Sequence, residues 1–366
     1  MEAHGGNLEA TARRLGCRPS QLLDASASLV PFALRWSARW ALLRADLRAY
    51  PDRSSQRLRT LLARLHQIEP DLLLPGNGAA ELFTWAARDA AQCGVSVLPQ
   101  PGFADYGRGL RCWDGVMEET SLPLQWDDTF PQAMPACASG DVLWITNPHN
   151  PTGQLWSRAS LEPLLDRYRL VICDEAFLPL VPNGEEQSLI SLVATTPNLV
   201  VIRSLTKLYG IAGVRLGYVV AQPERLQRWA GWRDPWPINA FASALAEAVL
   251  RDPRDYRLWC HRVQRWCAEE GQWLLDQLAL LPGIQPLPSA ANYLLIRGER
   301  SLQPLREALE TRHRILLRDC RSFPGLGESW LRIGYQNRRG NRRIIRALRT
   351  ELHQQPRQEL IGVAHR

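Results

Sequence analysis

Lysine is almost absent from this chain of 366 residues, because all but one of its 44 basic residues are arginine. Arginine keeps its proton in proteins, so it supplies charge but cannot act as a nucleophilic amine. The single exception, Lys207, stands among Ser204, Thr206 and several glycines and not in a charged run. A lysine that deprotonates can attack a carbonyl carbon. We therefore predict a chemical role for Lys207, and survival by drift is the alternative.

Long apolar runs are also missing. No stretch approaches the roughly 20 apolar residues of a membrane-spanning helix, and the chain begins Met-Glu-Ala-His-Gly-Gly without the basic and apolar pattern of a signal peptide. We expect a cytoplasmic protein with no membrane contact. The eight cysteines are scattered without a Cys-x-x-Cys pair, which argues against a disulfide framework and against a metal site.

Positive charge is in excess, with a net charge of +7 and a pI of about 9.2. Such a balance is compatible with nucleic-acid binding. The arginines are spread along the chain, however, except at 338–339 and 342–343. A basic surface serves small anionic substrates equally well, so we expect no nucleic-acid partner and keep a basic nucleic-acid-binding protein as a remote alternative.

Short β-rich runs alternate with helical patterns over the first two thirds of the chain. They predict an α/β fold, with a mostly parallel sheet covered by helices and a smaller α+β domain. We expect an N-terminal segment (1–36) that joins the small domain and the active site, a large domain (37–255) and a small domain (256–366). The strands are predicted at 72–74, 95–98, 141–146, 170–173, 199–203 and 214–221 in the large domain, and at 292–296, 314–317 and 330–333 in the small domain. Polar motifs follow several of these strands, at the sheet edge where α/β proteins place their chemistry.

Two of these motifs are suited to a phosphate group. Gly78 and Ala79 open a helix, where free backbone N–H groups can bind phosphate, although a glycine turn before a helix is common. Ser204, Thr206 and Arg215 flank Lys207 and could add hydroxyl and guanidinium donors to the same group.

Two further residues are suited to a pyridine ring. Asp174 ends the apolar run Leu-Val-Ile-Cys-Asp, where its carboxylate could hold a proton on a ring nitrogen or simply cap a helix. Asn147 could donate to a ring oxygen or serve only in the turn before Pro148. Together these residues match pyridoxal 5′-phosphate (PLP), which has an aldehyde for a lysine, a phosphate, a ring nitrogen for an acid and a ring oxygen for an amide. The residues predicted to bind its phosphate, Gly78, Ala79, Ser204, Thr206 and Arg215, are called the phosphate cup below.

Three motifs carry a resemblance to a known family. They are Asn-Pro-x-Asn-Pro-Thr-Gly at 147–153, Asp-Glu-Ala-Phe at 174–177, and Ser-Leu-Thr-Lys at 204–207 followed by Gly-x-Ala-Gly-x-Arg-x-Gly. With these motifs the sequence resembles the fold-type I PLP-dependent enzymes of the class I and II aminotransferase group. The resemblance implies that Lys207 carries the cofactor, that Asp174 pairs with its ring nitrogen and that Asn147 bonds its ring oxygen.

The resemblance also assigns residues outside these motifs. Phe103 would stack on the cofactor ring, and Arg332 would hold the α-carboxylate of the substrate. Tyr50 would reach the cofactor phosphate of the other subunit, which makes the expected active unit a homodimer.

Short segments at both ends of the chain point to one branch of that family. The start His4-Gly5-Gly6-Asn7 and the segments 24–28, 235–239 and 318–326 resemble the threonine-phosphate decarboxylases, which act in cobalamin biosynthesis. This resemblance implies PLP-dependent loss of CO2 from a phosphorylated amino acid, with His4, Gly5, Gly6, Asn7 and Arg318 as candidates for substrate binding. The histidinol-phosphate aminotransferases share the PLP motifs without that start and remain the alternative.

Overall fold

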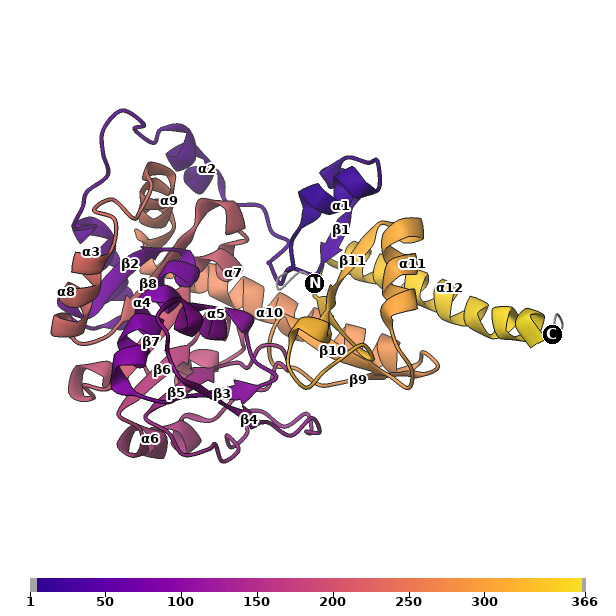
Figure 1. Cartoon of the computed structure of the whole chain (residues 1–366). Helices are drawn as coiled ribbons and strands as arrows, with labels where there is room; N and C mark the ends of the chain where they lie inside the picture. The colour runs from indigo at the N-terminus through magenta and orange to yellow at the C-terminus, as the bar shows by residue number, and fades with distance from the viewer. Residues whose placement is uncertain (1–4, 364–366) are drawn as a thin grey trace.

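The computed structural model of the protein describes residues 5–363, with side chains as far as residue 353. It contains a seven-stranded sheet and a five-stranded sheet. Figure 1 shows the two sheets side by side, with α10 running from one to the other. The helices are α1 Leu8–Arg14, α2 Trp36–Leu43, α3 Gln56–His66, α4 Gly78–Cys93, α5 Ala104–Cys112, α6 Arg158–Arg167, α7 Leu205–Tyr209, α8 Pro223–Trp232, α9 Ala240–Leu250, α10 Pro253–Ala279, α11 Gln303–His313 and α12 Arg338–Val363.

The large sheet has the strand order β2-β8-β7-β6-β5-β3-β4. Strands β4, β3, β5, β6 and β7 run parallel, whereas β8 is antiparallel to both β2 and β7. The prediction of a mostly parallel sheet is therefore confirmed. Its strands are β2 Leu73–Asn77, β3 Ser96–Gln100, β4 Met117–Ser121, β5 Val142–Thr146, β6 Leu170–Asp174, β7 Leu199–Ser204 and β8 Leu216–Val220.

Strand β4 was not predicted, because its sequence Met-Glu-Glu-Thr-Ser has no apolar run. It lies at the edge of the sheet, where charged side chains are tolerated and protect an open edge from further pairing. The central strand β5 shows the opposite pattern, since all its residues are buried. Val142 and Trp144 pack in a cluster with α4, whereas Leu143 and Ile145 pack in the cluster on the other face. A continuous apolar run is what a strand covered on both faces requires.

The small sheet has the order β1-β11-β12-β10-β9. Its strands are β1 Leu23–Ala25, β9 Ile284–Pro286, β10 Tyr293–Gly298, β11 Ile315–Asp319 and β12 Trp330–Gly334. Strand β1 pairs in parallel with β11, so the start of the chain becomes the edge of a sheet otherwise formed near its end. Figure 1 shows α1 and β1 beside β11 and α11.

Within residues 5–363, no helix combines the length and the apolar composition that crossing a membrane requires. The domain boundaries after residues 36 and 255 stay a proposal.

Candidate active site

Asp174 and Lys207 come from neighbouring strands of the large sheet. Asp174 is the last residue of β6, and Lys207 lies on α7, which begins directly after β7. Strands β6 and β7 are parallel, with Asp174 opposite Ile202. Parallel neighbours end at the same edge, so both side chains reach one cavity of about 300 Å³. The Lys207 ammonium nitrogen lies 5.4 Å from the centre of the Phe177 ring, on the wall of that cavity.

A buried ion pair aligns these two strand ends. Arg203, the last but one residue of β7, donates from Nε to Glu175, which directly follows β6, over 2.8 Å. Its other nitrogens reach Glu185 and Ser188. Arg203 and Glu175 are almost completely buried, where a charge is stable only when it is paired and hydrogen-bonded. The pair therefore fixes the chain immediately before Lys207 against the chain immediately after Asp174.

The Asp174 carboxylate has two fixed hydrogen-bond donors. The Tyr106 hydroxyl donates to Oδ2 over 2.6 Å, and the Ala176 backbone N–H donates to Oδ1 over 2.9 Å. Burial raises the pKa of Asp174 to about 6, while these two bonds pull it down. Asp174 therefore carries its negative charge near neutral pH. The pKa of Tyr106 is raised well above its usual value by burial and by Asp174, so its hydroxyl stays protonated and donates.

The Lys207 amine is shifted toward its neutral form. Burial and the positive charge of Arg332 together lower the pKa of Lys207 to about 8, against the opposing effect of Asp174. A neutral amine is the form that attacks a carbonyl carbon. The environment thus gives Lys207 the reactivity that an arginine could not have.

One end of the cavity is suited to a phosphate group. Ala79, Ser204, Thr206 and Arg215 line it, and α4 begins there without a side-chain cap on its backbone N–H groups. Gly78 has a φ of +73°, and a Cβ at this position would lie 2.7 Å from the Arg215 guanidinium. Only glycine therefore lets the guanidinium lie against the start of the helix, where the backbone also favours an anion.

The other end of the cavity is lined by two arginines of the small sheet. Arg318 on β11 is the direct antiparallel partner of Arg332 on β12, and cross-strand partners point to the same face of a sheet. Both are buried and line the cavity. Arg332 donates to Asn150 and, over 3.2 Å, to the Ser26 carbonyl. Its Nε is buried without a hydrogen-bond partner among the described residues, which is the state of a donor that awaits an anion.

The N-terminal segment borders this second end. Gly5 lines the cavity, and the Gly6 N–H donates to the Ser26 hydroxyl over 2.9 Å. Asn7 caps α1 by accepting from the Ala10 N–H. Gly6 and Asn7 line an adjoining cavity, which also contains Gly5 and Arg318. His4 lies outside the described residues.

Three predicted cofactor residues, Gly78, Asn147 and Tyr50, are not among the residues that line the cavity, although Gly78 directly precedes the lining residue Ala79. Asn147 is completely buried, and its side-chain amide exchanges two hydrogen bonds with the Trp156 backbone. These bonds use its carbonyl oxygen and one amide hydrogen, so one hydrogen is left for a ring oxygen. Tyr50 is 77% exposed and stacks on Trp236 with ring centres 4.4 Å apart. Phe103 does line the cavity, as predicted for a ring-stacking residue.

Three residues that support the site, Tyr106, Glu175 and Arg203, were not predicted from the sequence. Tyr106 stands three residues after Phe103 in a short helix, and nothing in its local sequence shows that it reaches Asp174 on another strand. Glu175 and Arg203 do stand beside motif residues. Glu175 directly follows one apolar strand, and Arg203 lies within the next. Opposite charges at such positions are a sequence signal for a buried ion pair.

Comparisons with known proteins agree with this geometry. The model of the family described as aminotransferase class I and II matches residues 20–348. The chain is 36% identical over 362 residues to a threonine-phosphate decarboxylase of Salmonella typhimurium, with 96% of each chain covered. It is 32% identical over 356 residues to a histidinol-phosphate aminotransferase of Symbiobacterium thermophilum, with 95% of each covered.

Solved structures give the same picture. The L-threonine-O-3-phosphate decarboxylase of Porphyromonas gingivalis superimposes with a TM-score of 0.79 at 26% identity, covering 91% of this chain and all of that one. The fold is also that of the histidinol-phosphate aminotransferase of Sinorhizobium meliloti, which was solved with pyridoxal 5′-phosphate (TM-score 0.79, 22% identity, 95% of each chain covered).

The fold and the cavity together define an enzyme of the fold-type I PLP-dependent class, in which a reactive lysine faces a buried carboxylate beyond the strand ends of a mostly parallel sheet. The chain belongs to the aminotransferase class I and II family, whose cofactor is PLP. Its own residues fit that cofactor, because the Gly78 cradle, Asp174 and Lys207 offer donors for a phosphate, a counter-charge for a pyridinium and an amine for an aldehyde.

Proposed function

We propose that the protein decarboxylates L-threonine O-3-phosphate to (R)-1-aminopropan-2-yl phosphate and CO2, for the side chain of cobalamin. The observation that carries this proposal is the cross-strand pair of buried arginines, Arg318 and Arg332, at the end of the cavity away from the phosphate cup. A substrate with both a carboxylate and a phosphate satisfies both guanidinium groups at once. The relative of Salmonella, which is similar over almost the whole chain, carries the name of this activity.

The residues divide the work as follows. Arg332 binds the α-carboxylate with its unpartnered Nε, while Arg318 and the backbone of the 5–7 segment bind the phosphate. The two anchors together fix the rotation of the amino acid and therefore which bond at Cα is broken. PLP, when bound, withdraws electrons from Cα of an amino acid. Asp174 holds the proton on the ring nitrogen, and the Lys207 amine returns a proton to Cα after CO2 has left.

Transamination of histidinol phosphate is the second candidate, because several similar relatives carry that name. Histidinol phosphate carries a phosphate ester in place of the carboxylate, so it offers one anionic group to the two arginines, Arg318 and Arg332, in the first half of that reaction. The two activities differ in their products. Purified holoenzyme supplied with O-phospho-L-threonine should release CO2 and form aminopropanol phosphate in equal amounts. Transfer of the amino group of histidinol phosphate to 2-oxoglutarate, without CO2 release from phosphothreonine, would refute the proposal.

We further propose that the active unit is a homodimer. Tyr50 is not among the residues that line the cavity of its own chain, and it forms an exposed aromatic face with Trp236. Trp36, Trp40 and Leu43 on α2 are exposed as well. A second copy would cover this face and receive Tyr50 at its phosphate cup. Mixed dimers of Lys207→Arg and Tyr50→Ala chains test the arrangement, because only they would contain one intact site. We expect activity in the mixture well above that of either parent, and no gain would contradict the proposed homodimer.

Location in the cytoplasm stays a prediction.

A further inference from the structure

A second cavity of about 370 Å³ adjoins the active-site cavity. The two share Gly5, Ser26 and Arg318 in their walls, so they meet at the buried arginine of β11. The second cavity lies between the N-terminal segment with α1 on one side and α11 with β11 on the other. The charged residues that line it are Arg14, Arg306, Arg318, Arg321, Glu310 and Asp319.

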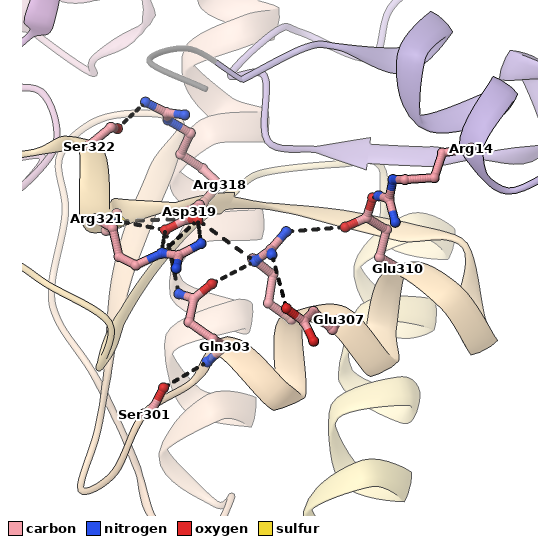
Figure 2. Close-up of polar contacts among 11 residues, drawn as sticks. Arg14, Ser301, Gln303, Glu307, Glu310, Arg318, Asp319, Arg321 and Ser322 are labelled. Carbon is pink, nitrogen blue, oxygen red and sulfur yellow. Dashed lines mark hydrogen bonds and ion pairs between the residues drawn. The ribbon is translucent and has the colours of Figure 1, made fainter. Parts of the chain in front are cut away.

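Guanidinium groups outnumber carboxylates among these lining residues, by four to two. Each carboxylate serves more than one arginine. Glu310 bonds both Arg14 and Arg306, and Asp319 is chelated by Arg321 while its Oδ2 lies 3.9 Å from Arg306. Figure 2 shows this chain of shared contacts, with Arg318 pointing away from it toward Ser322. The residues that line the cavity therefore keep an excess of two positive charges, and Glu307, which does not line it, lies 3.7 Å from Arg306.

The exposure of the arginines decreases toward the active site. The side chains of Arg14 and Arg321 are 58% and 37% exposed, that of Arg306 is 20% exposed, and Arg318 is buried. Cavity walls that carry one sign of charge concentrate ions of the other sign and raise their rate of capture. The charges thus form a path from the surface to the wall that the two cavities share.

Only some of the charged residues that line the second cavity have a purely structural role. The Arg14–Glu310 pair does tie α1 to α11. Arg321, in contrast, bonds a carboxylate only two residues away in its own turn, so it joins no distant elements. Its Nη1 has no hydrogen-bond partner among the described residues. Arg321 therefore contributes a positive charge and a free donor to the cavity rather than a connection within the fold.

We propose that this second cavity is an anion-binding antechamber, which takes up a phosphate monoester at Arg321 and Arg306 and passes it to Arg318. This inference rests on the proposed function, in which Arg318 binds the phosphate of the substrate. A phosphate monoester carries between one and two negative charges at neutral pH, which matches the excess of two positive charges. Free inorganic phosphate has the same chemistry and would occupy the antechamber as well.

Calorimetric titration of the holoenzyme with inorganic phosphate tests the site without relying on turnover. In Arg321→Gln, phosphate should bind about fivefold more weakly than in the wild type. Arg321→Lys, which keeps the charge, should recover most of the affinity. The matched control is Arg339→Gln, which removes one exposed charge from α12. Arg339 lines neither cavity, so this change should leave phosphate binding as it is. Equal affinity in Arg321→Gln and Arg339→Gln would overturn the proposal.

Steady-state kinetics with O-phospho-L-threonine separate capture from chemistry. Arg321→Gln should lower kcat/KM about fivefold through KM, and the remaining kcat/KM should depend less steeply on ionic strength. A lower kcat with an unchanged salt dependence would instead indicate a distorted active site and would contradict the antechamber. If the wild type does not turn over phosphothreonine at all, the proposed function fails, while the phosphate titration still decides the fate of the antechamber.

Discussion

The two ends of the active-site cavity are built in different ways. Lys207 and Asp174 follow the ends of parallel strands in the large sheet, and each stands within a short contiguous motif. Arg318 and Arg332 stand on antiparallel strands of the small sheet, and they become neighbours only through the register of β11 and β12. The cofactor end is therefore fixed by local chain geometry, whereas the substrate end is fixed by long-range pairing.

This difference separates two kinds of specificity. Residues at the strand ends determine which cofactor the chain can use, and that choice is common to the whole family. In the proposed function, residues on the small sheet determine how an anionic substrate is turned, and hence which bond at Cα breaks. On that proposal, a change of reaction within the family needs changes on the small sheet and in the N-terminal segment, with the large sheet left as it is.

The largest effect is expected at the cofactor end, for Lys207→Arg. Turnover should fall at least about 1000-fold, because a guanidinium neither attacks the cofactor aldehyde nor gives up a proton. The variant should keep its circular-dichroism spectrum and the oligomeric mass of the wild type. Borohydride reduction of the wild-type holoenzyme should fix the cofactor on the peptide that contains residue 207, and this label should be missing from the variant. Normal turnover by Lys207→Arg would show that the cofactor end of the cavity does not depend on Lys207.

The next effect concerns the support of the cofactor end. Arg203→Met should lower the free energy of unfolding by about 3–5 kcal/mol, because it leaves Glu175 buried without its positive partner. The shift of the urea midpoint measures it. Arg339→Met, on the exposed side of α12, is the matched control and should change stability by no more than about 0.5 kcal/mol. Equal midpoints for the two variants would show that the pair does not hold the strand ends.

At the substrate end, Arg332→Gln should raise the KM for phosphothreonine about 100-fold, because the substrate carboxylate loses its buried guanidinium partner. The visible spectrum of the bound cofactor should stay unchanged, since the cofactor end is intact. The product aminopropanol phosphate supplies the control, because it has no carboxylate. Its inhibition constant should be nearly the same in wild type and variant, and a parallel loss for substrate and product would place Arg332 at the phosphate instead.

The smallest effect is expected for Tyr106→Phe, which tests whether Tyr106 stabilises the ionised form of Asp174. The Tyr106 hydroxyl stabilises the ionised carboxylate, so its removal should raise the pKa of Asp174 above its value of about 6, by roughly one unit. The ionised form is the one that meets a pyridinium. Cofactor affinity, measured from pH 5 to 9, should therefore begin to fall at a higher pH as the pH decreases.

Tyr168→Phe is the control for that measurement, because the Tyr168 hydroxyl bonds the Ala138 carbonyl and not Asp174. Its pH profile should coincide with that of the wild type. Coincident profiles for Tyr106→Phe and the wild type would show that Tyr106 does not set the charge state of Asp174.

Much of the cofactor end could be predicted from the sequence. A strand end is visible as an apolar run that stops at a polar residue, so Asp174 and the Lys207 stretch were identified together with the parallel sheet between them. The fold class and PLP followed from the same motifs. In the large sheet the one strand missed is β4, which lies at an edge and carries no apolar run. In the small sheet, β1 and β9 were missed as well, and each has only three residues.

The partners of these residues could not be predicted. Tyr106 reaches Asp174 only because α5 packs where it does, and the alignment of Arg318 with Arg332 depends on a strand register that the 13 intervening residues do not encode locally. The second cavity depends on the docking of α1 against α11, which brings Arg14 to Glu310. Such contacts arise from tertiary packing, which periodicity and motifs do not report.

The pairing of β1 with β11 has a consequence for how the chain is made. Leu23 finds its strand partner only at Ile315, so during synthesis the N-terminal strand emerges long before the rest of its sheet exists. The large sheet can form while the ribosome is still translating, but the small sheet closes last, over a very long sequence separation. The N-terminal segment that borders the substrate cavity is thus among the first parts synthesised and among the last to fold. A chain whose translation stops before residue 315 would contain Lys207 but would lack β11 and β12, the strands that carry Arg318 and Arg332.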